Sequence, residues 1–573
     1  MAGVSISWRR GPVALAALAA LLIPVGCGAP DAKEPPDPSL SPSASPTALD
    51  PAAAAAALVG ELADEDLVGQ VLMPYAYGNS ATRVSSGSAA GNQKLAGVDT
   101  PAEMITKYRL GGLILVGFSA DDPTSENQVT SNVESPQQVR ELTRGLQDAA
   151  GRLAAGRVPM LIGTDQEFGV VTRIKDGITL LPSAMAAGAA GDPALTEAAW
   201  HAAGTELAAV GVNLDFAPVA DVLGADSKVI GSRSYGSDPQ AVAEQVAGAV
   251  RGLQGAGVAA TLKHFPGHGH TTADSHHNLP VLTQKRAALA ADDLPPFAAG
   301  IDAGAWLVMS GHLDVRAVDP GTAATFSRKV LTDLLRGELK FDGVVISDAM
   351  NMAPAMRWPA GEAAVRAINA GNDLLLMPPD VSAAYDGLLA ALRDGRLARE
   401  RLVEAVTRVL TLKFRLAAHP TPEISVLGSA AHRQAAGRLA AASVTLLRGT
   451  CDGPLVSGPV TVTSSGGRKT TRTLLTAALR EAGVEVVDQG GTVVHLVGYG
   501  DGTGDLRSDA AVTVAMDLPY LLGRARSEVL LATYSSSPVS MAALADVLAG
   551  RTKPTGRAPV AVPGLPRTTC TGS

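Results

Sequence analysis

The sequence predicts an α/β protein in which a (β/α)8 TIM-type barrel is followed by a smaller α/β (αβα) sandwich domain. Between residues 52 and 418, short runs rich in Val, Ile and Leu alternate with longer Ala-rich stretches, as in repeated βα units around a parallel sheet. Polar residues follow these runs, and such barrels build their sites at the carboxyl ends of their strands. A doubly wound open sheet is the structural alternative. The eight expected strands span residues 70–75, 112–117, 159–164, 213–218, 259–264, 306–311, 343–348 and 373–378.

The N-terminal segment indicates export. Two arginines precede an apolar stretch over residues 13–25, which is shorter than the roughly 20 residues that span a bilayer. The stretch runs into "LIPVGC", which resembles a bacterial lipobox with Cys27 as the lipidated residue, although Pro24 stands where Leu is usual. We therefore expect residues 1–27 to be a signal peptide and the protein to be a lipoprotein on the outer face of the bacterial cell membrane. A plain secretory signal is the alternative.

A tether and two domains are expected after the signal peptide. Residues 28–51 are rich in Pro, Ser and small residues and cannot bury enough apolar surface to fold. The barrel is expected over residues 52–418, and the second domain over residues 427–573, where the βα pattern resumes after two prolines. Cys451 and Cys570 both lie in that second domain. An exported protein can join two such cysteines in a disulfide, and two free thiols are the equal alternative.

Composition narrows the classes of partner. Apolar residues make up 46% of the chain, charged residues 18%, and the formal net charge is -8 without a long run of Lys and Arg. A surface of this kind is not built to neutralise phosphates, so we expect no nucleic-acid partner. The number of chains that assemble is left open.

The stretch "KHFPGHGHTTADSHHNLP", residues 263–280, holds five of the ten histidines. Imidazole is the commonest ligand for zinc, but Pro266, Gly267 and Gly269 break any helix that would place these rings on one face. No Cys lies nearby and no HExxH pattern is present, so we expect neither a metal nor another cofactor.

A second interpretation of this stretch is acid–base chemistry. Asp274 lies two residues before His276, and a carboxylate at that spacing can accept one ring N–H and stabilise the imidazolium. The other ring nitrogen is then available to exchange protons with a substrate. Taken alone, the spacing is more typical of a solvated loop.

The motif "KHFPGHG" followed by "DSH" resembles glycoside hydrolase family 3, and specifically its exo-β-N-acetylglucosaminidases. The resemblance implies that His276 transfers the proton and that Asp274 supports it. The segment "GVVISDAMNM" resembles the family's nucleophile segment, which implies that Asp348 is the nucleophile. A carboxylate suits this task because it can form a glycosyl ester that splits one hard displacement into two easier ones.

Two further segments imply a sugar-binding set. "GTDQEFGVVTRI" resembles the family's Asp-Gln-Glu segment but departs from it at Phe168 and Val170, where Gly and Arg are usual. "IGSRSYGSDP" resembles the segment that carries another arginine of the set. The residues that the resemblance assigns to substrate binding are Asp165, Arg173, Arg233, Lys263 and His264.

The resemblance implies a retaining, exo-acting hydrolysis of terminal β-linked N-acetylglucosamine (GlcNAc) from peptidoglycan fragments, through a covalent glycosyl-enzyme. Whether the substrate is intact cell wall or a released muropeptide, and whether water or phosphate accepts the glycosyl group, is left open. One alternative is a family 3 β-glucosidase or β-xylosidase, which uses a Glu as acid and base. The other is a non-catalytic, surface-tethered glycan-binding protein, for which Phe168 and Val170 are the only support.

Overall fold

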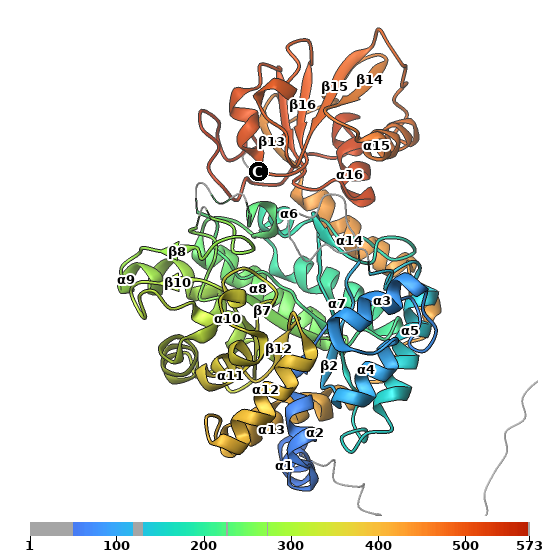
Figure 1. Ribbon diagram of the computed structural model, residues 1–573. Helices are drawn as coiled ribbons and strands as arrows, with labels where there is room; N and C mark the ends of the chain where they lie inside the picture. Colours follow the sequence, from blue (N-terminus) through green and yellow to red (C-terminus); the bar gives the residue numbers. More distant parts are fainter. Residues whose placement is uncertain (1–49, 118–129, 225–226, 228, 272, 571–573) are drawn as a thin grey trace, which may run out of the picture. The chain divides into compact units, whose positions relative to one another are not determined.

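The computed structural model describes residues 50–117, 130–224, 227, 229–271 and 273–570 (Figure 1). The expected signal peptide with Cys27, and residues 28–49 of the expected tether, lie outside the described residues. Helix α1 (Pro51–Glu61) begins at Pro51 and is capped by the side chain of Asp50, so the last residues of the expected tether already belong to folded structure. None of the helices within the described ranges is long and apolar enough to cross a bilayer.

Eight parallel strands, all within the described residues, form the barrel. Six pair in the order β11-β9-β7-β6-β3-β2, and β1 pairs with β12. Parallel bridges between Tyr75 and Ile114 and between Ile346 and Leu374 join the two sets. The sheet therefore closes, which confirms the expected barrel and makes the open-sheet alternative wrong. The strands are β1 (Leu72–Met73), β2 (Gly112–Ile114), β3 (Leu161–Thr164), β6 (Leu214–Asp215), β7 (Ala259–Phe265), β9 (Leu307–Ser310), β11 (Val344–Ser347) and β12 (Leu375–Leu376).

The helices of the barrel begin where the sequence supplies capping groups. Asp192 and Asp238 each accept two backbone N–H groups at the start of α7 and α8, and a proline follows each aspartate. The barrel helices are α2 (Asp64–Gln70), α3 (Ser86–Ala96), α4 (Pro101–Tyr108), α5 (Pro136–Ala150), α6 (Ala184–Ala190), α7 (Pro193–Ala209), α8 (Pro239–Gly255), α9 (Arg286–Ala288), α10 (Pro295–Asp302), α11 (Ala360–Ala370), α12 (Val381–Asp394) and α13 (Arg399–Ala417).

Short elements follow several barrel strands and shape the site. The strands β4 (Gln166–Phe168) and β5 (Val171–Thr172) form a hairpin directly after β3, and β8 (Val281–Leu282) pairs with β10 (Asp314–Val315). A single helical turn, η1 (Gly231–Arg233), precedes α8, and η4 (Lys329–Glu338) precedes β11.

The C-terminal part of the chain is a second α/β domain. Its strands run in the order β13-β17-β16-β15-β14, and only β13 is antiparallel to its neighbour within the described sheet. One face of the sheet packs on the apolar sides of α14, α15 and α16. The elements are α14 (Ala430–Ser443), β13 (Thr445–Arg448), β14 (Val460–Ser464), α15 (Lys469–Glu481), β15 (Thr492–Val497), β16 (Val512–Ala515), β17 (Val529–Ala532) and α16 (Pro538–Leu548).

The other face of this sheet packs against the barrel. Its apolar residues share one buried cluster with residues of α6 and of the segments that follow β6. The hydroxyl of Ser183 donates to the carbonyl of Tyr534 at 2.7 Å, and the hydroxyl of Ser232 donates to Asp517. Ser232 precedes Arg233, so the second domain directly contacts the turn that carries one of the expected sugar-binding residues.

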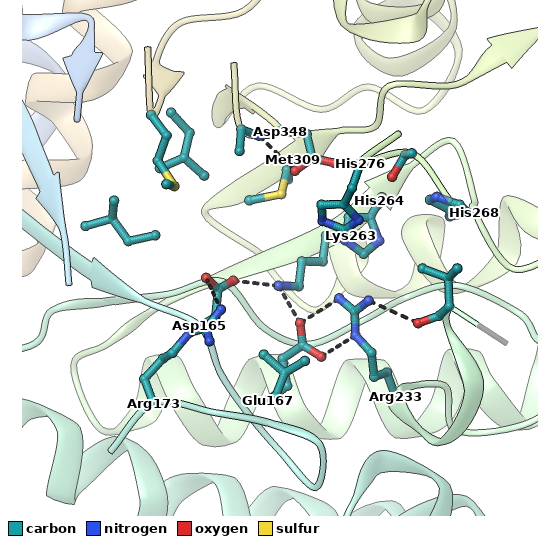
Figure 2. Close-up of a pocket in the computed structure, with 17 residues that line it drawn as sticks. Asp165, Glu167, Arg173, Arg233, Lys263, His264, His268, His276, Met309 and Asp348 are labelled. Carbon is teal, nitrogen blue, oxygen red and sulfur yellow. Dashed lines mark hydrogen bonds and ion pairs between the residues drawn. The ribbon is translucent and has the colours of Figure 1, made fainter. Parts of the chain in front are cut away.

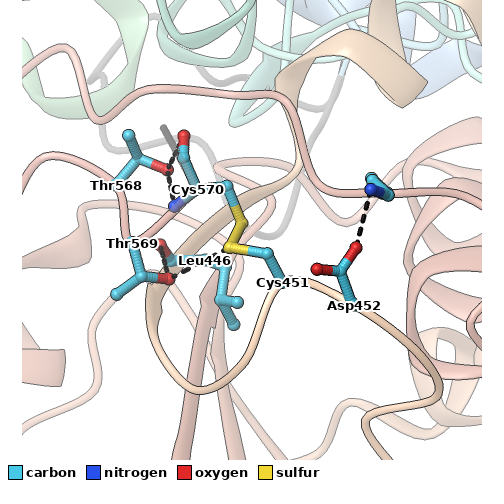
Figure 3. The surroundings of a disulfide bond; sticks show 7 residues. Leu446, Cys451, Asp452, Thr568, Thr569 and Cys570 are labelled. Carbon is cyan, nitrogen blue, oxygen red and sulfur yellow. Dashed lines mark hydrogen bonds and ion pairs between the residues drawn. A yellow bond between two sulfur atoms is a disulfide. The ribbon is translucent and has the colours of Figure 1, made fainter. Parts of the chain in front are cut away.

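Cys451 and Cys570 form a disulfide in the structure, with their Cα atoms 5.5 Å apart (Figure 3). Cys451 follows β13, and the backbone N–H of Thr569 donates to the carbonyl of Leu446 in that strand at 2.8 Å. The bond therefore ties the end of the chain to the first strand of the second domain, across a sequence separation of 119 residues.

Replacing Cys451→Ser is expected to lower the free energy of unfolding by about 2–5 kcal/mol, because the unfolded chain regains the freedom that a long closed loop removes. Urea denaturation of the second domain, followed by circular dichroism with and without reductant, measures this. Reductant should shift the wild-type midpoint toward that of the variant and leave the variant unchanged. Equal midpoints for oxidised wild type and variant would contradict the expectation.

Candidate active site

A pocket opens at the carboxyl ends of the barrel strands (Figure 2). Its walls come from β2, β7, β9 and β12, from the residues directly after β3 and β11, and from the β4–β5 hairpin, η1 and the histidine loop after β7. All five residues expected to bind substrate line it, together with the expected nucleophile and the expected proton donor. These residues are Asp165, Arg173, Arg233, Lys263, His264, His276 and Asp348.

A buried ion network forms the floor of the pocket. Nε and Nη2 of Arg233 donate to the two oxygens of Glu167 at 2.7 and 2.8 Å. Nζ of Lys263 donates to Glu167 at 2.6 Å and to Asp165 at 2.9 Å. Burial alone would raise the pKa of Glu167, but Arg233 and Lys263 together hold it well below its usual range. Burial would lower the pKa of Lys263, but Asp165 and Glu167 raise it above its usual value.

The β4–β5 hairpin places Arg173 beside Asp165. The side-chain oxygen of Gln166 accepts the backbone N–H groups of Arg173 and Ile174, each at 3.0 Å, which fixes the hairpin. Nη1 of Arg173 donates to the carbonyl of Gly117 at 3.2 Å, and Nη2 lies 3.9 Å from Asp165. A guanidinium donor and a carboxylate acceptor therefore stand together at the pocket edge.

The two departures from the family pattern lie away from this pocket. Phe168 is buried, adopts a left-handed backbone conformation with φ of 65°, and packs edge-on against Trp200 with ring centroids 5.5 Å apart. Val170 is at the tip of the hairpin, and Val171 is the residue that lines the pocket. Neither of the two residues that supported a non-catalytic binding protein is among the described residues that line the pocket.

Asp221 orients His264. Its carboxylate accepts the backbone N–H of His264 at 3.0 Å, the Nδ1–H of the same ring at 2.8 Å and the backbone N–H of His268 at 2.7 Å. Burial lowers the pKa of His264 to about 3 and raises that of Asp221 to about 6. At neutral pH the imidazole is therefore uncharged, and its Nε2 is an acceptor for a substrate hydroxyl.

The Asp274–His276 pair has the geometry of an acid–base dyad. Nδ1–H of His276 donates to Asp274 at 2.5 Å, and the backbone N–H of His276 donates to the same oxygen at 2.9 Å. Burial raises the pKa of Asp274, but these two bonds outweigh it and bring the pKa to about 2. Asp274 is therefore a permanent anion behind the imidazole ring that lines the pocket.

Asp348 directly follows β11 and lines the same pocket (Figure 2). One of its carboxylate oxygens accepts the N–H of Ala349 at 2.8 Å, and its own N–H donates to the carbonyl of Ser310 at 2.9 Å. The N–H of Ala353 donates to the carbonyl of His276 at 3.4 Å. The segment after Asp348 therefore contacts the histidine loop directly.

Two other histidines of the loop, His268 and His270, have partners within the structure. Nδ1–H of His270 donates to the buried Asp293 at 2.7 Å, and Gln284 donates to the second oxygen of Asp293 at 2.8 Å. His268 lines the pocket and contacts Thr271, whereas His277 is exposed. Among the described residues, no group of three His, Cys, Asp or Glu side chains is placed to hold a metal ion.

Comparison with known proteins identifies the family. The family profile described as "Glycosyl hydrolase family 3 N terminal domain" matches residues 66–412, which include every barrel strand and every residue of the site above. The chain belongs to glycoside hydrolase family 3. The match ends before the second domain, which lies C-terminal to residue 412.

Individual relatives within family 3 agree with this. A protein from Pseudoalteromonas piscicida named beta-hexosaminidase A is 33% identical over 376 residues, which cover 60% of each chain. Beta-hexosaminidase from Pseudomonas aeruginosa is 41% identical over 271 residues, covering 46% of this chain and 77% of the relative. The chain thus spans less than two thirds of the length of the first relative. A solved family 3 β-N-acetylglucosaminidase from Paenibacillus is 33% identical, with a TM-score of 0.75 over 89% of this chain and all of that one.

Glu167 and Asp221 are among the site residues to which the sequence assigns no role. Both follow expected strands at the end where family 3 barrels build their sites, and that position was the available signal. Their partners lie far away in sequence, 66 residues in the case of Glu167 and Arg233. Only the folded barrel brings these charges together.

Replacing Glu167→Gln is expected to lower the free energy of unfolding at pH 7 by about 3–5 kcal/mol, because two buried cations lose their shared anion. The pKa of Glu167 is depressed in the folded protein, so its contribution is present above the unfolded pKa of about 4.3 and is lost as the pH falls below it. Urea denaturation at pH 7 and pH 3.5 measures both effects.

The control for this substitution is Glu197→Gln, which removes an exposed partner of Arg251 and should cost less than about 1 kcal/mol. The loss of unfolding free energy caused by Glu167→Gln should be smaller at pH 3.5 than at pH 7. A loss of unfolding free energy equal to that of Glu197→Gln, or a loss that is larger at pH 3.5, would contradict the role of the buried network.

Proposed function

We propose that the protein is a retaining, exo-acting β-N-acetylglucosaminidase that removes terminal β-linked GlcNAc from peptidoglycan fragments. The observation that carries this proposal is the shared pocket of Asp348 and the Asp274–His276 pair. Membership of family 3 and the names of the relatives support the same reaction class and the same sugar.

In the first step, one carboxylate oxygen of Asp348 attacks the anomeric carbon while Nε2–H of His276 protonates the departing oxygen. The products are a glycosyl ester of Asp348 and the free aglycone. In the second step, His276 takes a proton from water, the water oxygen attacks the anomeric carbon, and Asp348 leaves. Asp274 stabilises the imidazolium in each cycle and keeps Nδ1 protonated, so that Nε2 is the nitrogen that exchanges protons.

The proposed sugar-binding residues include both hydrogen-bond acceptors and hydrogen-bond donors. Asp165 and the acceptor nitrogen of His264 suit the hydrogens of sugar hydroxyls, whereas Lys263, Arg173 and Arg233 suit their oxygens. Because the ion network already fixes these donors, little reorganisation is needed when a sugar binds. The reaction uses only protein groups and water.

The pocket favours this assignment over a β-glucosidase with a glutamate acid. Glu167 is the one glutamate among the described residues that line the pocket. It is bound by Arg233 and Lys263 with its pKa held low, so it is a poor proton donor.

We also propose that the protein acts outside the cell, tethered through a lipid on Cys27. The support is the sequence alone, an apolar leader that ends in a lipobox-like segment. Fractionation of cells that express wild type or Cys27→Ser tests it. Wild type should sediment with membranes and the variant should be released; equal release of both would rule out the anchor.

Replacing His276→Ala is expected to lower kcat/KM for 4-methylumbelliferyl β-N-acetylglucosaminide about 10²–10⁴-fold, the range for loss of a general acid. The loss should be much smaller for the 2,4-dinitrophenyl glycoside, because that leaving group needs no proton. Asp348→Ala should abolish turnover of both substrates.

The exposed neighbour His277 gives the matched control, and His277→Ala should retain wild-type rates. Turnover of an aryl β-glucoside that is indifferent to His276 would favour a family 3 β-glucosidase instead. No turnover of any of these glycosides by wild type would favour a binding protein.

A further inference from the structure

A second pocket lies beside the segments that carry Asp348 and His276 and shares no described lining residue with the candidate active site. Its walls come from the end of the histidine loop, the segment before η4, the segment after β11 and helix α11. We call it the arginine pocket. Its defining residues are Leu279, Phe326, Arg328, Arg357, Trp358 and Arg366.

A stack of aromatic rings separates the arginine pocket from the active site. Trp358 packs edge-on against Phe326, with ring centroids 4.7 Å apart. Phe326 stacks on His312 at 6.2 Å, with the ring planes 7° apart. Nε2–H of His312 donates to the carbonyl of Ala349 at 3.0 Å, and Ala349 lines the active-site pocket next to Asp348. Phe326 and His312 therefore connect Trp358 of the arginine pocket to the backbone of Ala349 in the active site.

The backbone also connects the candidate active site with the arginine pocket. Leu279 follows His276 by three residues and lines the arginine pocket. Pro354, which also lines it, follows Ala353, whose N–H donates to the carbonyl of His276. The two segments that carry the proposed acid and nucleophile thus continue directly into the walls of the arginine pocket.

The charged residues that line the arginine pocket are all basic. Three arginines line it, and none of its described lining residues is acidic. Arg366 pairs with Glu362 at 2.8 Å on the same helix, and the guanidinium carbons of Arg357 and Arg366 lie 5.8 and 5.1 Å from the ring centroid of Trp358. Within the described residues, Arg328 and Arg357 have no carboxylate partner, although the chain as a whole carries a formal charge of -8.

We propose that the arginine pocket binds a carboxylate carried on the aglycone, the part of the substrate that leaves when the terminal GlcNAc is removed. This inference rests on the proposed function and names a property of its substrate. Guanidinium groups bind carboxylates through paired, charge-assisted hydrogen bonds, and Trp358 and Phe326 offer apolar surface to the body of the same group. A lactyl carboxylate on the leaving sugar and a carboxylate on an attached peptide share this chemistry.

The test compares wild type with the double variant Arg328→Gln, Arg357→Gln. Three substrates are used: GlcNAc linked β-1,4 to N-acetylmuramic acid, its methyl ester, and the same disaccharide carrying an L-Ala–D-Glu dipeptide. We expect kcat/KM for acidic substrates to fall about ten- to hundredfold in the double variant, the range for loss of hydrogen bonds to a charged group. The 4-methylumbelliferyl glycoside should be unaffected.

The substrates distinguish the two sources of the carboxylate. A loss with the plain disaccharide acid assigns the pocket to the lactyl group, and a loss only with the dipeptide form assigns it to the peptide. Arg152→Gln, which removes an exposed arginine that does not line the pocket, is the matched control and should change nothing. Equal effects on acid and ester, or no effect on either acidic substrate, would overturn the proposal.

A binding measurement separates this inference from the proposed function. Calorimetry with N-acetylmuramoyl-L-Ala–D-Glu should show binding to wild type that weakens with added KCl, and loss of that binding in the double variant. If no glycoside is turned over but this binding pattern holds, the proposed function fails and the anion site stands. If glycosides are turned over and wild type does not bind this compound, the inference fails alone.

Discussion

The site depends on burying opposite charges at the carboxyl ends of the barrel strands. A carboxylate such as Glu167 is costly to remove from water unless it is paired and fully hydrogen-bonded. Here Arg233 from η1 and Lys263 from β7 both reach it, and Lys263 also contacts Asp165 after β3. These contacts fix three separate segments relative to one another, so the groups that we propose bind the sugar are held in place before a ligand arrives.

Contacts outside the ion network hold the neighbouring segments of the site in place. Asp221 holds His264 and the start of the histidine loop, and Asp293 holds His270 further along the same loop. The second domain contacts the barrel next to Arg233, through Asp517 and the hydroxyl of Ser232. We infer that this domain stabilises the turn that carries Arg233, whereas the described residues that line the pocket all belong to the barrel.

Much of the barrel could be predicted because local pattern and global fold agree there. Each expected range overlaps one barrel strand, although β1, β6 and β12 have only two residues each, and the polar residues that follow mark the end of the barrel where such sites lie. The partners of Glu167 could not be predicted, because Arg233 becomes its neighbour only when the barrel closes. The pairing of Cys451 with Cys570 was undecided for the same reason, since spacing along the chain does not fix a distance in space. The arginine pocket combines residues from four segments, and no single motif marks it.

The central claim is that Asp348 carries the sugar as a covalent ester. Incubation with 5-fluoro-β-N-acetylglucosaminyl fluoride, followed by mass spectrometry of the intact protein and its peptides, tests this most directly. We expect one added fluorosugar, located on the peptide that contains Asp348 and absent from Asp348→Asn. A label on another carboxylate, or turnover of ordinary substrate with inversion and without any label, would contradict it.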